Sequence, residues 1–398
     1  MLSAKRNKII FPSSAAETIA NNDDLLIQIL LCLPIKSLFK FKSVSKHWLS
    51  LITNPLFSRR LFPFNSPCAL FVRKSFRLEN EFDFIMIDDK YSIDAPFKTL
   101  EFIDDTIRII QSCNGLLLCS SVQFYLPEAK YYVYNPTTNQ YAILPPLTGS
   151  ADEICGLYLA FDPLKSPNYK VIRLLQSEIS EPDFQIEIYS SKINHEWKVS
   201  NAGFTLESLD IGTHDGVFCN GAIHWYTDFG PSFYFDVDKE QVKEMAMPAT
   251  PEEWYRRRVL YFRECRGHLY LVEIYNAPST KFNVWEMEKD YSGWIVKYRI
   301  DLDGIVRAFP GMIRSYLDPS ALNYYVFQIM YIVKGERDED EEDDGSYLVL
   351  HIPTKIIRYN LKDKSFKKLC DFNPYEQEDA SYMIHYGAYE YIQSLACV

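Results

Sequence analysis

A unit of about 50 residues recurs from residue 113 onward, and it restricts this chain to folds built from repeated small sheets. In each copy, a strand ending in an aromatic residue is followed by a polar turn and a second strand that begins with an aromatic or β-branched residue. The steps between successive copies are 55, 46, 50 and 74 residues. The first aromatic residues of the five copies are Tyr134, Tyr189, Phe235, Trp285 and Tyr359. This period predicts a β-propeller with four strands in each blade.

Glycines ahead of several copies support the same architecture. Gly115, Gly221 and Gly267 each precede a hydrophobic strand, where glycine supplies the positive φ of a hairpin turn. We expect a sixth blade to combine a strand near residues 69–72 with the C-terminal segment 389–395, which would close the ring. A sandwich with long hairpins is the alternative, but five similar turns at a near-regular period argue against it.

Composition and charge narrow the class of protein. Aromatic residues make up 15% of the 398 residues, which favours sheet, and the net charge of −11 argues against nucleic-acid binding. We expect no membrane partner, because no apolar run approaches the length that crosses a bilayer. The nine cysteines form no CxxC pair and no signal peptide is visible, so we expect a reduced chain in the cytoplasm, the nucleus or both.

The first sixty residues differ from the rest in charge and pattern. They hold nine basic and three acidic residues, whereas the remainder holds 33 basic and 50 acidic residues. Asn22 begins a helix with a 3.6-residue apolar period that ends at Pro34, and a second short helix passes through Leu38 and Phe41. A third carries Val44, Trp48, Leu51 and Ile52, and ends before Asn54-Pro55. Three short helices bury little surface alone, so we predict a module that completes its core on another protein; the alternative is that the second domain covers it.

The run from Asn22 to Ile52 resembles an F-box over residues 20–60, through its double-leucine helix start, its Leu33-Pro34-Ile-Lys-Ser-Leu38 turn and its Phe41-to-Trp48 segment. The resemblance implies docking on the acidic Skp-family adaptor of a cullin–RING ubiquitin ligase. The family's opening Leu-Pro is replaced by Asn21-Asn22, which puts the strength of adaptor binding in question, and Ser45 stands where cysteine is common. The residues expected to bind the adaptor, or to form the box's own core, are Leu25, Leu26, Ile29, Leu30, Pro34, Leu38, Phe41, Val44, Trp48 and Leu51.

Residues 105–398 resemble the F-box-associated, kelch-like domain of plant F-box proteins. The resemblance depends on four short motifs in order, at residues 112–118, 134–138, 144–146 and 391–395. We therefore predict a multidomain α+β chain: a flexible basic tail at 1–19, a three-helix F-box at 20–60, a connecting segment with first strands at 61–104, and an all-β propeller of about six blades at 105–398. The acidic run 336–344 is expected to be a solvated loop, with an acidic lure for a partner as the alternative.

No catalytic, cofactor or metal motif is present, and His224 and His268 are expected to be satisfied core histidines. Cys113 and Cys119 are expected to be buried free thiols rather than zinc ligands. One run suits a recognition patch on the propeller rim, because Trp, Tyr and Arg dominate interface hot spots, although a solvated loop between blades is the alternative. It consists of Trp254, Tyr255, Arg256, Arg257 and Arg258.

The expected function is that of a non-catalytic, substrate-recognition subunit of an SCF-type (Skp–cullin–F-box) ubiquitin ligase. The F-box would bind the Skp-family adaptor and, through it, the cullin–RING ligase, while the propeller would hold an unknown target protein near the ubiquitin-carrying enzyme. Two rival functions stay open: a scaffold that binds the adaptor without presenting a target for degradation, and a propeller enzyme with an unrecognised site.

Overall fold

The computed structural model describes residues 19, 22–62, 66–74, 80–88, 93–97, 99–100, 106–121, 129–146, 153–176, 183–193, 196–205, 216–227, 232–252, 257–276, 278–321, 323–335, 345–372 and 387–398. Apart from Ile19, the predicted basic tail lies outside these residues, as does the predicted acidic loop at 336–344.

The N-terminal residues 22–62 form a bundle of short helices, here called the helical module. Its helices are α2 (Asp23–Leu31), α3 (Ile35–Phe41), α4 (Lys46–Ile52) and α5 (Pro55–Leu61). The predicted cap of α2 is confirmed, because the backbone N–H of Leu25 donates to Asn22 Oδ1 over 3.1 Å. Ser45 has a structural role of its own: its hydroxyl accepts from the N–H of Trp48 and caps α4.

The fourth helix, α5, was not predicted. The Asn54-Pro55 pair was interpreted only as the end of the preceding helix, whereas it also begins the next one. Asn54 Oδ1 accepts from the N–H of Leu56 over 2.9 Å, and Pro55 occupies the first helical position, where its missing N–H costs no hydrogen bond. The pair therefore ends α4 and begins α5. Helix α5 contributes Phe57 to the core of the module.

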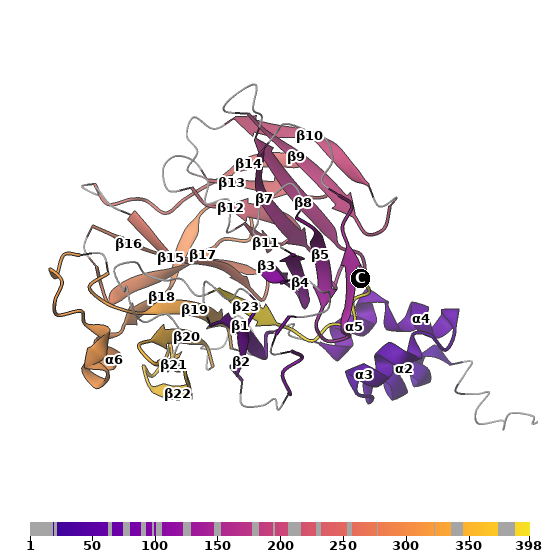
Figure 1. Ribbon diagram of the computed structural model, residues 1–398, viewed down its shortest axis with the longest axis horizontal. Coiled ribbons are helices and arrows are strands. Elements are labelled where there is room, and N and C mark those ends of the chain that lie inside the picture. Colours follow the sequence, from indigo (N-terminus) through magenta and orange to yellow (C-terminus); the bar gives the residue numbers. More distant parts are fainter. Residues whose placement is uncertain are drawn as a thin grey trace, which may run out of the picture.

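The rest of the described chain forms six small antiparallel sheets, the blades of a propeller (Figure 1). Blade 1 contains β1 (Ala69–Arg73), β2 (Phe82–Met86) and β23 (Ala388–Tyr391). Blade 2 contains β3 (Arg108–Cys113), β4 (Leu116–Ser120), β5 (Tyr131–Asn135) and β6 (Gln140–Ile143). Blade 3 contains β7 (Glu153–Ala160), β8 (Lys170–Gln176), β9 (Asp183–Ser190) and β10 (Trp197–Thr205).

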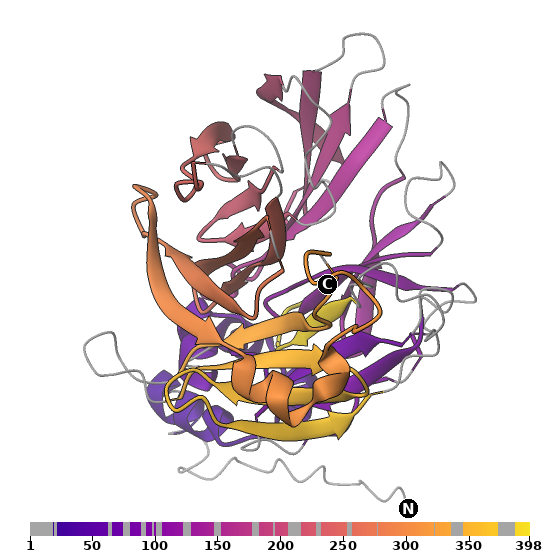
Figure 2. The ribbon, with the colours of Figure 1, turned by 90° about the vertical axis from the view of Figure 1, so that its left-hand side faces the viewer.

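The second half of the ring is built in the same way. Blade 4 contains β11 (Val217–Cys219), β12 (Ala222–Trp225), β13 (Ser232–Asp236) and β14 (Gln241–Met245). Blade 5 contains β15 (Arg257–Cys265), β16 (His268–Tyr275), β17 (Lys281–Met287) and β18 (Trp294–Asp301). Blade 6 contains β19 (Gln328–Val333), β20 (Tyr347–Ile352), β21 (Lys355–Asn360) and β22 (Phe366–Asp371). Between blades 5 and 6 lie α6 (Asp303–Ala308) and η2 (Pro310–Met312), and Figure 2 shows α6 in orange in front of the yellow strands of blade 6.

The first and last strands of the propeller close the ring. The C-terminal strand β23 pairs with β1, with Phe71 opposite Tyr389 and Val72 opposite Ala388. The other side of blade 1 packs on blade 6, where the hydroxyl of Tyr347 donates to the carbonyl of Ile87 over 2.7 Å. The predicted sixth blade, shared between the two ends of the propeller, is confirmed.

The repeat in the sequence corresponds to one hairpin in each of blades 2 to 6. All five repeat aromatics, from Tyr134 to Tyr359, lie on the third strand of blades 2 to 6, and the strand after the polar turn is the fourth. The predicted glycine turns are confirmed too, since Gly115, Gly221 and Gly267 have φ values of 90°, 89° and 78°. At Gly115 the turn also lies against the C-terminal segment: a Cβ there would come within 2.5 Å of Ser394 Cβ.

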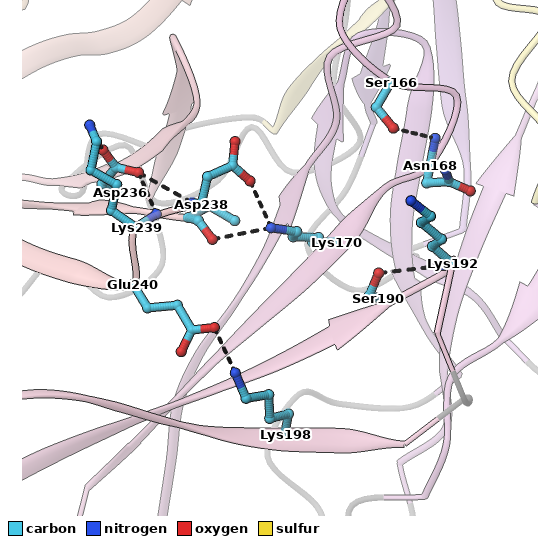
Figure 3. Close-up of polar contacts among 11 residues, drawn as sticks. Ser166, Asn168, Lys170, Ser190, Lys192, Lys198, Asp236, Asp238, Lys239 and Glu240 are labelled. Atoms are coloured by element: carbon cyan, nitrogen blue, oxygen red, sulfur yellow. Dashed lines mark hydrogen bonds and ion pairs between the residues drawn. The ribbon is translucent and has the colours of Figure 1, made fainter.

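Ion pairs link neighbouring blades at the surface. Figure 3 shows Lys170 and Lys198 of blade 3 reaching the turn that joins β13 and β14 in blade 4. Lys170 Nζ lies 2.8 Å from Asp238 Oδ1, and Lys198 Nζ lies 2.9 Å from Glu240 Oε1. Because one partner of each pair is largely exposed, each pair contributes at most about 1 kcal/mol, and apolar packing between the blades supplies most of the cohesion.

Candidate functional site

The helical module has a small core of its own. Leu26, Leu30, Leu38, Ile52 and Phe57 are buried together, and the rings of Phe41 and Trp48 pack edge to face beside them with centroids 5.4 Å apart. Three residues expected to bind the adaptor or form this core, Leu26, Leu30 and Leu38, are therefore inside the module. Phe41, Trp48 and Leu51 are half-buried.

A second group of apolar side chains on the module faces solvent. Of the ten residues predicted to bind the adaptor or form the core, Leu25, Ile29, Pro34 and Val44 are exposed. Leu25 and Ile29 are one helical turn apart, so both lie on the same side of α2. That these four residues bind the adaptor stays a prediction. The structure shows that they are exposed, whereas the core residues among which they lie in the sequence are buried.

Sequence reasoning missed two members of this group, Leu49 on α4 and Leu56 on α5. Leu56 is 63% exposed, the most open large apolar side chain of the module. Its position follows from the unpredicted helix α5, so the missed sequence signal was the Asn54-Pro55 helix start. The group Leu25, Ile29, Pro34, Val44, Leu49 and Leu56 is called the exposed apolar set below.

The C-terminal segment attaches the helical module to the propeller. Leu395 packs into the core of the module, and the buried ammonium of Lys42 donates to the carbonyl of Leu395 and lies 3.2 Å from Cys397 Sγ. On the other side, Asn135 Nδ2 of blade 2 donates to the carbonyls of Ser394 and Ala396 over 3.1 and 2.9 Å. Figure 1 shows the C-terminus beside α5 and blade 2. The module is thus held in a defined position against the propeller.

Only the last two residues of the predicted recognition run, Arg257 and Arg258, are described, and they begin β15. Trp254, Tyr255 and Arg256 fall outside the described residues. The side chain of Arg257 is only 7% exposed, and its Nη2 lies 2.8 Å from Glu273 Oε2. Burial lowers the pKa of Arg258 to about 10. Arg257 therefore presents no free guanidinium to solvent, whereas Arg258 is half-buried, and the run's role in binding a target stays a prediction.

The centre of the propeller holds a polar cavity of about 80 Å³ lined by inner strands. Glu264 on β15 and Glu390 on β23 border it together with Arg263, whose Nη1 lies 3.9 Å from Glu390 Oε2. Burial raises the pKa of Glu264 to about 7 despite the hydrogen bond from the N–H of Gly267, and the carboxylate charges of Glu390 and Asp162 add to the effect.

The two histidines singled out in the sequence are both partnered. Burial lowers the pKa of His224 to about 4; its ring nitrogens lie 3.1 Å from the carbonyl of Val217 and 2.9 Å from the hydroxyl of Tyr291. His268 Nδ1 lies 2.6 Å from Glu286 Oε1. They are the satisfied core histidines that were predicted.

The cysteines and carboxylates show no metal arrangement where they can be described. Cys113 and Cys119 are buried free thiols, as predicted, and burial raises the pKa of both. Among the described residues, no group of three or more His, Cys, Asp or Glu side chains is placed to hold a metal ion. In the same part of the chain, every helix is too short or too polar to cross a membrane.

These observations define a helical module fixed to a six-bladed propeller, and comparisons with known proteins assign both parts. Residues 22–60 match the F-box domain, and residues 68–303 match the F-box associated beta propeller domain. F-box protein At5g07610 of Arabidopsis thaliana is 39% identical, over 98% of this chain and 95% of its own length. F-box protein At5g49610 of the same plant is 28% identical, over 73% of this chain and 81% of its own length.

The chain therefore belongs to the F-box proteins that carry an F-box associated β-propeller domain. Such proteins serve in general as substrate receptors of SCF ubiquitin ligases, and a Skp-family adaptor is the general partner of an F-box. The propeller match ends at residue 303, but blade 6 and the closing strand β23 continue the same architecture to Tyr391.

Proposed function

We propose that this chain is a non-catalytic substrate-recognition subunit of an SCF-type ubiquitin ligase. The exposed apolar set binds the Skp-family adaptor, and the propeller binds the target protein. Ubiquitin transfer is then promoted by proximity, because the complex holds lysines of the target close to the ubiquitin-carrying enzyme. We also place this activity in the cytosol or nucleus, where free cysteines such as the nine found here persist.

The observation that carries the proposal is the solvent exposure of large apolar side chains on a module that already has its own core. Ile29 is 44% exposed while its neighbour Leu30 is fully buried. Completely burying a fully exposed side chain of this size is worth about 1.5–3 kcal/mol, so covering several of these partly exposed side chains would favour binding of a partner. The attachment through Leu395 and Lys42 supports the same role, since a fixed module sets the position of a bound target.

A pulldown with purified Skp-family adaptor and the full chain tests adaptor binding. The variant Ile29→Asp places a charge in the exposed apolar set without touching the core, and we expect it to weaken binding at least about 30-fold. Ile193→Asp is the matched control, because Ile193 is 62% exposed on a propeller turn, and it should bind as the natural chain does.

Two results would contradict the proposal. If Ile29→Asp keeps full affinity, the exposed apolar set is not the adaptor surface. If the natural chain itself does not bind, the Asn21-Asn22 replacement of the family's Leu-Pro has disabled the box, and the propeller must act without the ligase.

A further inference from the structure

Blade 4 has much shorter strands than blade 5, so part of one sheet face of blade 5 is not covered by the described strands of blade 4. The strands β11 to β14 have 3, 4, 5 and 5 residues, whereas β15 to β18 have 9, 8, 7 and 8. Leu271 and Trp285, on adjacent strands of blade 5, pack with Met245 of blade 4. Side chains alternate between the faces of a strand, so Glu273, Tyr275 and Asn283 continue this face beyond the reach of blade 4.

A hollow of about 550 Å³ lies over this uncovered face. We call it the blade-5 groove, and its polar and aromatic lining includes Glu273, Tyr275, Lys281, Asn283, Trp285 and Arg299. Asn283 and Arg299 are directly opposite each other on β17 and β18, and Trp285 is two residues further along β17. The groove therefore places an amide, a guanidinium and an indole beside one another.

The charges in the blade-5 groove are unequally satisfied. The carboxylate of Glu273 accepts hydrogen bonds from the guanidinium of Arg257 and from the hydroxyl of Tyr275, the latter over 2.7 Å. Lys281 lies 3.2 Å from Asp301 and 2.9 Å from Asp303. Arg299 is exposed and makes no hydrogen bond or ion pair within the described part of the chain, and the same holds for the amide of Asn283. The unpaired charge of the groove is therefore positive, although the whole chain carries −11.

The groove and the helical module lie at opposite ends of the blade strands. Arg59 of the module donates to the carbonyl of Leu164, in the turn that follows the inner strand β7. In blade 5, the turn after the inner strand β15 lies at the same end of the blades as this contact. The next strand, β16, runs away from that turn, so Tyr275 at the end of β16 and Lys281 at the start of β17 lie at the opposite end. Figure 1 likewise shows blade 5 and α2–α5 on opposite sides of the molecule. A protein bound in the groove would not compete with the adaptor for space.

We propose that the blade-5 groove binds an extended segment of the target protein that carries an aspartate or glutamate next to a large apolar residue. The carboxylate pairs with the guanidinium of Arg299, whose planar fork suits two parallel hydrogen bonds, and the apolar side chain packs on Trp285. Asn283 supplies hydrogen bonds to the backbone of the segment. This assignment rests on the proposed function, because it names the surface and the class of peptide by which the receptor holds its target.

Fluorescence polarisation with defined peptides tests the groove. The probes are two labelled nine-residue peptide mixtures that each place Leu or Phe beside a fixed central residue, which is Glu in one mixture and Lys in the other. With the full chain bound to its Skp-family adaptor, we expect the Glu mixture to bind at least about 10-fold tighter than the Lys mixture. Arg299→Glu should abolish or reverse this preference, and Arg307→Glu, on the exposed end of α6, should leave it unchanged.

The outcomes separate this inference from the proposed function. Equal binding of the two mixtures, or an unchanged preference in Arg299→Glu, refutes the proposal that the blade-5 groove binds the target. If the same sample binds the adaptor, the proposed receptor function is retained. Loss of adaptor binding by the natural chain overturns the receptor role whatever the peptides do. Because Arg299 is exposed, Arg299→Glu should keep its unfolding midpoint, which confirms that the folded protein was tested.

Discussion

Replacing Leu30 with alanine should open the helical module while leaving the propeller folded. Leu30 is fully buried among Leu26, Leu38 and Ile52, and it is one of only five buried side chains that the module supplies to its own core. Removing the isopropyl group beyond its Cβ loses transfer free energy and leaves a cavity, at a cost of about 2–5 kcal/mol. A module of about 40 residues has little stability to spare, so this cost is a large fraction of the total.

Hydrogen exchange of backbone amides measures the effect directly. When closing is faster than exchange, the exchange rate follows the opening equilibrium, so a loss of about 2 kcal/mol accelerates exchange in α2 to α5 roughly 30-fold, while exchange in the strands of blades 2 to 6 should not change. Ile29→Ala, one residue away but exposed, should change module stability by no more than about 0.5 kcal/mol. Unchanged protection in Leu30→Ala, or an equal acceleration in Ile29→Ala, would refute the division of the module into a core and an exposed apolar set.

Three further predictions concern the propeller and its attachment. Burial raises the pKa of Glu264 to about 7, so the folded state keeps a proton that the unfolded state loses above about pH 4.5. The free energy of unfolding therefore falls, on the order of 1–3 kcal/mol, as the pH rises from about 4.5 to about 7. Urea unfolding of Glu264→Gln should show a weaker pH dependence, and an identical one would contradict this. Glu273→Gln leaves the buried guanidinium of Arg257 without its carboxylate and should cost about 3–5 kcal/mol in urea unfolding, so an unchanged midpoint would show that the pair is not buried. Leu395→Asp inserts a charge into the interface with the helical module and should increase the radius of gyration in X-ray scattering, whereas Leu56→Asp, at an exposed site, should not.

The propeller was predictable because its repeat has a local cause. Each repeated aromatic lies on a third strand, and the polar turn after it leads to the fourth strand of the same blade, so the period of the sequence is the period of the structure. The closing pair of β1 and β23 followed from the strand patterns at the two ends, since a ring with one incomplete blade exposes unpaired edges. The positive φ of Gly115, Gly221 and Gly267 is likewise a local property of short hairpins.

The division of apolar residues within the module was not predictable, because it depends on tertiary contacts. Leu25 and Leu26 are adjacent and chemically identical, yet packing against Leu38 and Ile52 buries only Leu26. The burial of Arg257 depends in the same way on Glu273, which lies on the neighbouring strand. The blade-5 groove could not be found in the sequence either, because it results from the difference in strand length between two neighbouring blades.

The central claim is that this chain delivers a bound target for degradation, and the lifetime of proteins in cells tests it most directly. Protein half-lives would be compared between cells in which the natural chain is replaced by Ile29→Asp and cells in which it is replaced by Ile193→Asp. The account predicts that at least one protein that binds the purified propeller-containing chain has a longer half-life with Ile29→Asp only. If every half-life is the same in the two cell lines although the natural chain binds the adaptor, the chain is a scaffold rather than a substrate receptor.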